Sequence, residues 1–276
     1  MPEGHTLHRV AAELREHFAG RVVASTSPQG RFTAGAARVD RRRLLAAEAW
    51  GKHLLLRFED VAESVHVHLG LFGGWTITTC DEEPEVVGQV RWRLRSGAVT
   101  SDLRGPTACE LLTPGECASL LARLGPDPLR DDADPDDAWR RVSTSRASVA
   151  TLLMDQSAIA GVGNVYRAEV LFRHRLPPDL PGRELDRTTW DAVWTDLRDL
   201  MRAGVRSGRI DTVRSEHTPE AMGRDPRIDA HGGEVYVYRR AGLPCMLCGN
   251  GVLTRIVGGR KLFWCPACQR ADRLTS

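Results

Sequence analysis

Four of the seven cysteines have a spacing that is typical of a metal site. Cys245 and Cys248 form one C-x2-C pair, and 16 residues later Cys265 and Cys268 form a second. Two such pairs supply four thiolates in a tetrahedron, which is the ligand set of structural zinc and leaves no position for a reactive water. Disulfide bonds are the alternative, but they are rare in the reducing compartment that we expect for this chain. The spacing therefore predicts one structural Zn²⁺ per chain.

The first residues could carry nucleophilic chemistry. Removal of Met1 would give Pro2 a free secondary amine, and an α-amino group has more free base near neutral pH than a lysine side chain. The neighbouring carboxylate of Glu3 could transfer protons. The plainer interpretation is a helix start, because Pro and Glu are common in a first turn, and these two residues alone favour it.

Lysine is rare in this chain, so each lysine is a candidate for a specific role. The chain has 36 arginines but only two lysines, Lys52 and Lys261. A lysine amine can deprotonate or act as a compact charge, which a guanidinium cannot do. Lys52 is therefore a candidate, although two lysines could also survive by chance. His66 and His68 alternate on an expected strand without further ligands nearby, so we expect them to be structural.

Two glycine-flanked motifs are candidates for ligand contacts. In HLGLFGGW, Leu71 and Phe72 stand between glycines, where a core residue would be unusual; packing between sheets is the alternative. In GVGN, Gly163 and Asn164 mark a turn before a helix, and N–H groups at a helix start can bind phosphate. On local grounds, an ordinary turn between two helices explains the second motif as well.

Apolar periodicity predicts the elements that must position these residues. Residues 3–18 have the spacing of an amphipathic helix, and seven short β-rich runs between residues 21 and 103 are typical of a sandwich or barrel. A short helix is expected from Thr113 and Pro114 onward, because a capping residue precedes a proline there.

The second half of the chain is predicted to be helical. The stripe that begins at Trp190 indicates a long helix capped by Asp186. Residues 209–232 show little periodicity and are expected to form a long loop, and the run EVYVY at 234–238 is expected to be a strand. Arg260 is expected near the tip of a hairpin between the two cysteine pairs.

Length, charge and hydropathy exclude several classes of protein. The chain of 276 residues has no run of 18 apolar residues and no signal-peptide pattern at its start, so we expect a cytoplasmic protein. Its net charge of +2 divides into −4 for residues 1–140 and +6 for residues 141–276. The basic second half is the better candidate for contact with phosphates.

Four motifs that follow one another along the chain resemble those of a known family. They are MPEG at the start, GKHLL around Lys52, LLMDQSAIAGVGNVYRAEVLF at 152–172 and the four-cysteine segment that contains FWCPACQ. Together they resemble the formamidopyrimidine-DNA glycosylase and endonuclease VIII family of base-excision repair enzymes, over essentially the whole chain. The first and last motifs are more similar to those of the endonuclease VIII branch. The many arginines resemble the composition of actinobacterial members.

The resemblance implies an α+β fold in four parts. These are an N-terminal catalytic domain of a helix and a β-sandwich (1–125), a linker (126–140), a helical DNA-binding domain with a helix-two-turn-helix (141–240) and a four-cysteine zinc-finger hairpin (241–276).

The resemblance also implies a role for each candidate residue. Pro2 matches the nucleophile that attacks C1′ of the damaged nucleotide and forms an imine, Glu3 its acid/base partner, and Lys52 a lysine near the reacting sugar. Leu71 and Phe72 match residues that fill the gap left by an everted base. The residues implied to bind DNA elsewhere are Gly163, Asn164, Tyr166 and Arg260.

The implied function is that of a bifunctional DNA glycosylase and abasic-site lyase that excises oxidised pyrimidines and cuts the strand by β,δ-elimination. The expected partner is double-stranded DNA with a damaged base or an abasic site, with single-stranded DNA as an alternative. A monomer at the nucleoid, with no membrane partner, is expected. Two alternatives are a purine-directed formamidopyrimidine (8-oxoguanine) glycosylase and a DNA-binding zinc-ribbon protein without catalysis.

Two positions depart from the pattern of the family. Thr6 stands where a second glutamate is common, and Gly70 stands where endonuclease VIII often has a polar residue that fills the gap in the duplex. Thr6 cannot perform a reaction step that the family assigns to the second glutamate. Gly70 cannot make the contacts with the opposite base that a polar side chain would make.

Overall fold

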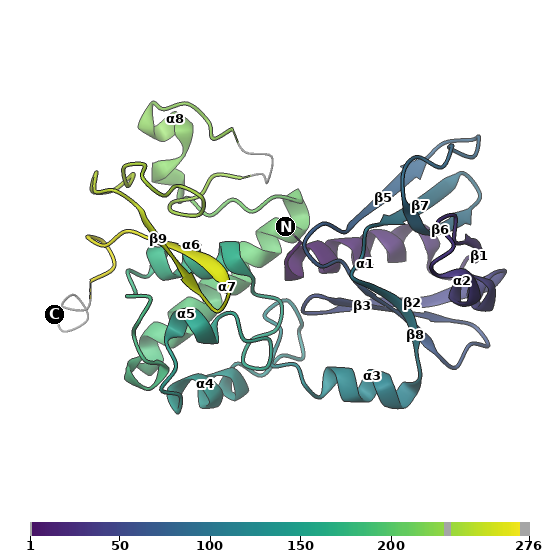
Figure 1. The fold of residues 1–276 in the computed structure, drawn as a ribbon, viewed down its shortest axis with the longest axis horizontal. Helices are drawn as coiled ribbons and strands as arrows, with labels where there is room; N and C mark the ends of the chain where they lie inside the picture. Colours follow the sequence, from purple (N-terminus) through teal and green to yellow (C-terminus); the bar gives the residue numbers. More distant parts are fainter. Residues whose placement is uncertain (1, 229–232, 271–276) are drawn as a thin grey trace. The chain divides into compact units, whose positions relative to one another are not determined.

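The computed structural model describes residues 2–228 and 233–270, and these divide into two compact units, 1–123 and 124–276 (Figure 1). The α+β class predicted from the sequence is confirmed. None of the helices in the described ranges is both long and apolar enough to cross a membrane.

The first unit consists of a long helix, eight strands and two short helices. In chain order these are α1 (Gly4–Phe18), β1 (Val22–Thr26), α2 (Thr33–Val39), β2 (Arg42–Trp50), β3 (His53–Phe58), β4 (Ser64–His68), β5 (Gly74–Thr79), β6 (Val90–Ser96), β7 (Val99–Arg104), β8 (Ala108–Leu112) and α3 (Pro114–Leu121). Seven of these strands coincide with the predicted β-rich runs. β8 and α2 were not predicted.

The eight strands are hydrogen-bonded in the order β5-β7-β6-β1-β2-β3-β4-β8, with every neighbouring pair antiparallel. Only two residue pairs join β1 to β2. The sheet is therefore held most weakly at its middle, and Figure 1 shows β5, β7 and β6 lying apart from β2, β3 and β8.

Helix α1 supplies one side of the core of this unit. Its apolar residues recur at helical spacing, and they pack in one cluster with residues of both halves of the sheet, such as Leu54, Val67 and Trp92. The residues of α1 that are buried in this way are Leu7, Val10, Ala11, Leu14 and Phe18. This packing fixes the start of the helix, and with it the first residues of the chain.

The second unit contains helices followed by a two-stranded hairpin. Its elements are α4 (Pro135–Ser143), α5 (Val149–Leu152), α6 (Asn164–Arg173), a 3₁₀ turn η1 (Gly182–Glu184), α7 (Arg187–Ser207), a 3₁₀ turn η2 (Ser215–His217), α8 (Pro219–Met222), β9 (Leu253–Val257) and β10 (Arg260–Trp264). Asp186 caps α7 as predicted, because its side chain accepts a hydrogen bond from the N–H of Thr189. The cluster that includes Trp190, Phe172, Leu262 and Cys265 gives the helices and the hairpin one common core.

Part of the expected linker 126–140 is folded within this second unit. Asp127 is buried, and its side chain accepts a hydrogen bond from the N–H of Leu129 at 2.9 Å. Ala138, in α4, lies in the core. The acidic residues of this segment thus cap turns and the start of a helix, in addition to meeting solvent.

The predicted strand at 234–238 is wrong, and one buried carboxylate explains why. Glu169, in α6, is fully buried, and its two oxygens accept four hydrogen bonds. The donors are the backbone N–H groups of Tyr236 (2.7 Å), Val237 (2.9 Å) and Tyr238 (2.8 Å) and the hydroxyl of Thr212 (2.7 Å). Three consecutive N–H groups that converge on one side chain cannot alternate between two directions as a strand requires.

Candidate functional site

The candidate nucleophile lies at the start of α1, beside a fully buried carboxylate. Glu3 precedes the helix in an extended conformation and has no exposed surface, whereas Pro2 is half-buried. The N–H of Glu3 donates to the hydroxyl of Thr6 at 3.4 Å, and the N–H of Thr6 donates to the carbonyl of Glu3 at 2.9 Å. Thr6, where the family often has a glutamate, therefore helps to hold the first turn.

His5 is a buried neighbour that the sequence analysis missed. Its Nε2 lies 3.3 Å from the Thr6 hydroxyl. Burial, followed by the positive charges of the N-terminus, Arg9 and His8, lowers the pKa of His5 to about 4. The imidazole is therefore neutral near pH 7. No apolar periodicity indicated its burial, because His5 lies outside the stripe that begins at Leu7.

Lys52 lies in the tight turn between β2 and β3. Trp50 pairs with His53 across this hairpin, and Gly51 supplies the positive φ of 59° that the turn needs. Lys52 is half-buried. Burial above all lowers the pKa values of His53 and His68, and the charge of Lys52 adds a smaller effect in the same direction, so the amine lies in the same neighbourhood as those two imidazoles.

The next loop projects two apolar side chains into solvent. Leu71 is 46% exposed and Phe72 is 92% exposed, so the alternative that they pack between sheets is wrong. They lie in a turn of residues 69–73 that is closed by the N–H of Gly73 donating to the carbonyl of Leu69 at 3.0 Å. We call this segment the 69–73 turn.

Gly70 is required by this turn for two reasons. Its φ is +67°, and a Cβ at this position would lie 1.9 Å from the hydroxyl oxygen of Thr107. The positive φ alone disfavours any residue with a side chain. A polar residue that fills the gap in the duplex would strain the backbone at this position and would displace the Thr107 hydroxyl.

In the second unit, the predicted helix-two-turn-helix consists of α5, the turns at 153–163 and α6. Gly163 directly precedes α6, and the side chain of Asn164 donates to the carbonyl of Lys261 at 2.9 Å. Arg167, missed by the sequence analysis, donates both to the Asn164 side chain and to the Lys261 carbonyl. The start of α6 is therefore attached to β10 of the hairpin. Tyr166 is fully buried, so its side chain offers no surface to DNA.

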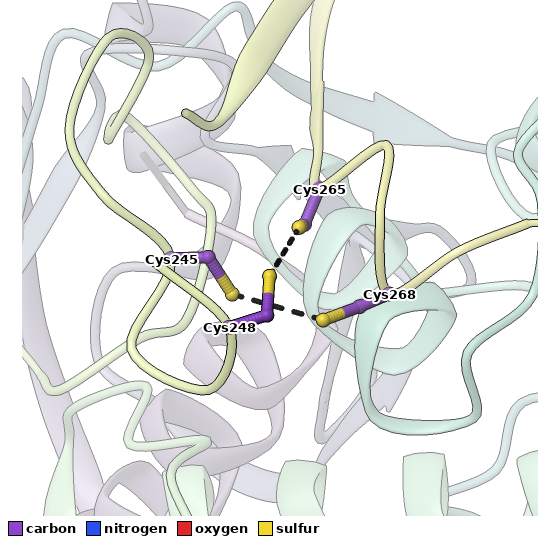
Figure 2. A group of neighbouring side chains, drawn as sticks. All are labelled: Cys245, Cys248, Cys265 and Cys268. Carbon is purple, nitrogen blue, oxygen red and sulfur yellow. Dashed lines mark hydrogen bonds between the residues drawn. The ribbon is translucent and has the colours of Figure 1, made fainter. Parts of the chain in front are cut away.

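The four cysteines come together as the spacing predicted (Figure 2). Their sulfur atoms all lie within 4.8 Å of one another, with 3.9 Å between Cys245 and Cys268 and 3.5 Å between Cys248 and Cys265. A tetrahedral zinc with bonds of about 2.3 Å places its sulfurs about 3.8 Å apart. The cluster is thus consistent with a structural zinc ion.

Polar groups around the cluster also fit a metal-bound thiolate. The N–H of Leu247 points to the sulfur of Cys245 at 3.5 Å, and the side-chain amide of Asn250 points to that of Cys248 at 3.5 Å. Such donors stabilise negative sulfur. Gln269 binds the N–H of Cys265 and the carbonyl of Leu176, which ties the cluster to the helices.

Arg260 begins β10 beside the tip of the hairpin, as predicted. It pairs with Val257 across a turn formed by Gly258 and Gly259, and it is exposed. The candidates thus fall into two groups. Pro2, Glu3, Lys52 and the 69–73 turn belong to the first unit, whereas the helix-two-turn-helix, Arg260 and the cysteines belong to the second.

Comparison with known proteins agrees with this architecture. Residues 1–109 match the formamidopyrimidine-DNA glycosylase N-terminal domain, and residues 124–215 match the formamidopyrimidine-DNA glycosylase H2TH domain. The chain belongs to the formamidopyrimidine-DNA glycosylase and endonuclease VIII family. The helix-two-turn-helix expected from the sequence is confirmed by the second match.

Within the family, the chain is 50% identical to Endonuclease 8 1 of Mycobacterium tuberculosis, over 98% of this chain and 100% of that protein. It is 31% identical to the formamidopyrimidine-DNA glycosylase of Streptomyces avermitilis, over the full length of both. Among solved structures, a formamidopyrimidine-DNA glycosylase of Lactococcus lactis bound to DNA with an abasic site has a TM-score of 0.75. It is 19% identical and covers 97% of this chain and 99% of that one, which supports the fold.

Proposed function

We propose that the chain is an endonuclease VIII-type DNA glycosylase and abasic-site lyase of base-excision repair whose nucleophile is the amine of Pro2. Half of its residues are identical to those of Endonuclease 8 1 over nearly its whole length, and this observation carries the proposal. Pro2 beside the buried Glu3 supplies the amine and the carboxylate that the reaction needs. A zinc-ribbon protein without catalysis would have no need of this pair.

The first chemical step replaces the damaged base with the enzyme's amine. The Pro2 nitrogen attacks C1′ of the sugar and loses its proton, while the bond from C1′ to the base breaks and the base leaves with a proton. The nitrogen lone pair then displaces O4′ from C1′, and Glu3 donates the proton that O4′ takes up. The product is an iminium ion that links Pro2 to the opened sugar.

The iminium ion makes strand cleavage possible, because it withdraws electrons from C2′. Loss of a C2′ proton expels the phosphate on C3′, and subsequent loss of a C4′ proton expels the phosphate on C5′. Both ends of the gap then carry phosphates, as expected for β,δ-elimination. Lys52 would hold the charge of the neighbouring phosphate or sugar oxygen as a compact cation.

DNA is the partner that this chemistry requires. The main-chain groups of Gly163 and Asn164 at the start of α6 would bind phosphates near the lesion, and exposed Arg260 would bind the phosphate of the everted nucleotide. Leu71 and Phe72, which project from the 69–73 turn, would fill the space that the base leaves. We propose a monomer that acts at the nucleoid in the cytoplasm on duplex DNA, and that also accepts single strands.

The proposed substrates are oxidised pyrimidines rather than 8-oxoguanine. The identity to Endonuclease 8 1 is 50%, against 31% to a formamidopyrimidine-DNA glycosylase. Duplexes with thymine glycol, 5-hydroxyuracil or 8-oxoguanine, compared by single-turnover rate, test this choice. Faster excision of 8-oxoguanine than of every oxidised pyrimidine would reverse the choice of branch. Absence of cleavage at an abasic site would refute the proposed enzyme altogether.

A further inference from the structure

Three histidines and a glutamate lie together on one face of the sheet in the first unit. In the register of β3, β4 and β8, His53 pairs with His68, and His66 pairs with Glu110. Residues two apart on a strand share a face, so His66 and His68 both point to the side opposite the buried Val67. The same face borders a cavity of about 490 Å³ that these four residues help to line.

A chain of hydrogen bonds joins three of these residues. The Nδ1 of His66 lies 3.0 Å from a carboxylate oxygen of Glu110, and its Nε2 lies 2.9 Å from Nδ1 of His53. The carboxylate accepts, so His66 donates through Nδ1, and its Nε2 shares one proton with Nδ1 of His53 in the second hydrogen bond. Burial above all lowers the pKa of His53 to about 3, so this ring is neutral near pH 7.

The ring of His53 also contacts His68, which anchors the 69–73 turn. The two ring centres are 5.0 Å apart. Nδ1 of His68 accepts a hydrogen bond from the N–H of Gly70 at 3.1 Å, immediately before Leu71. A cavity borders these rings on one side, so packing there is incomplete, and the hydrogen bonds act together with the ring contacts to set their orientation.

We propose that Glu110, His66 and His53 are positioning residues that hold His68 against Gly70 and thereby fix the 69–73 turn in the conformation that projects Leu71 and Phe72. The proposal rests on the proposed function, in which these two side chains fill the gap left by an everted base. Excision from a duplex requires that gap to be filled, whereas cleavage at an abasic site in a single strand does not. Loss of these hydrogen bonds should therefore slow the step in which the base is everted more than the chemistry at Pro2.

The test compares two reactions of full-length, zinc-loaded protein. H66A removes both hydrogen bonds of the central ring. We expect its single-turnover excision of thymine glycol from a duplex to fall about tenfold, the order of effect that the loss of buried hydrogen bonds has. Its cleavage of an abasic site in a single strand should stay within about twofold of the unaltered protein. E110A removes the exposed residue at the end of this chain of hydrogen bonds. Its rate of excision from a duplex should therefore fall by less than that of H66A, with cleavage of the single strand unchanged.

Three further variants make the result decisive. L71A/F72A should show the same split, and adding H66A to it should cause no further loss, because both changes act through one turn. H17A, a histidine change on α1 outside the network, should leave both rates unchanged. Equal losses in the two reactions for both H66A and E110A, or additive losses with L71A/F72A, would overturn the proposal. Failure of the unaltered protein to form a borohydride-trapped complex with an abasic-site duplex would instead refute the proposed function.

Discussion

Replacement of Glu169 with glutamine tests whether one buried carboxylate organises the second unit. In the structure, one oxygen accepts from Tyr236 and Thr212, and the other accepts from Val237 and Tyr238. An amide keeps one acceptor oxygen but turns an NH2 group toward two donors. The Thr212 hydroxyl can rotate, so one buried N–H loses its acceptor and the remaining bonds lose their charge. We expect E169Q to cost about 3 kcal/mol of unfolding free energy.

Thermal unfolding followed by circular dichroism, with zinc retained, measures this cost. For a unit of this size, about 3 kcal/mol corresponds to a fall in Tm of about 6–12 °C. T212V is the matched control, because it removes one hydrogen-bond donor and leaves the carboxylate; its cost should be about 1 kcal/mol. An E169Q protein within 1 kcal/mol of the unaltered one would refute the argument that the carboxylate holds residues 236–238.

Three other perturbations have definite expected outcomes. Zinc chelation or C265S should unfold the hairpin and abolish DNA binding, whereas R260A should keep its zinc, measured by metal analysis, and weaken binding in a salt-dependent way. Equal zinc loss in both variants would make Arg260 structural. The pKa of His5 is about 4 in the folded protein and 6.5 in an unfolded chain, so the unfolded state binds the proton more readily between these values. Stability should therefore fall by up to about 3 kcal/mol as the pH drops from 6.5 to 4, and urea titrations should show a weaker fall for H5N. G70A should lower the free energy of unfolding of the first unit by about 1–2 kcal/mol or more in urea titrations, because alanine disfavours the positive φ at this position. The double variant G70A/T107A should recover the part of this loss that comes from the contact between the new Cβ and the Thr107 hydroxyl.

The sequence predicted those parts of the fold that depend on local pattern. The spacing of Leu7, Val10 and Leu14 gave α1, and the cysteine pairs gave the metal cluster, because in each case neighbours along the chain are also neighbours in space. The position of Arg260 near the hairpin tip was also predictable, because the hairpin joins residues that are close along the chain.

Long-range polar contacts could not be predicted in this way. The segment at 234–238 has the composition of a strand, but Glu169, more than 60 residues earlier, takes its N–H groups. His66 was expected to be structural, and the structure adds partners from two other strands that no spacing could show, His53 and Glu110. Gly70 departs from the pattern of the family, and two facts that only the structure supplies, its positive φ and the nearby Thr107 hydroxyl, explain why a side chain is disfavoured there.

The identity of the attacking amine is the central claim, and one measurement tests it directly. Protein that begins at Pro2 is incubated with an abasic-site oligonucleotide and borohydride, digested, and the sugar adduct is located by mass spectrometry. We predict that the adduct lies on Pro2, and that protein that retains Met1 gives almost none, because its Pro2 nitrogen is an amide without a reactive lone pair. An adduct on Lys52 in the Pro2-terminated protein, or equal trapping with Met1 retained, would contradict the account.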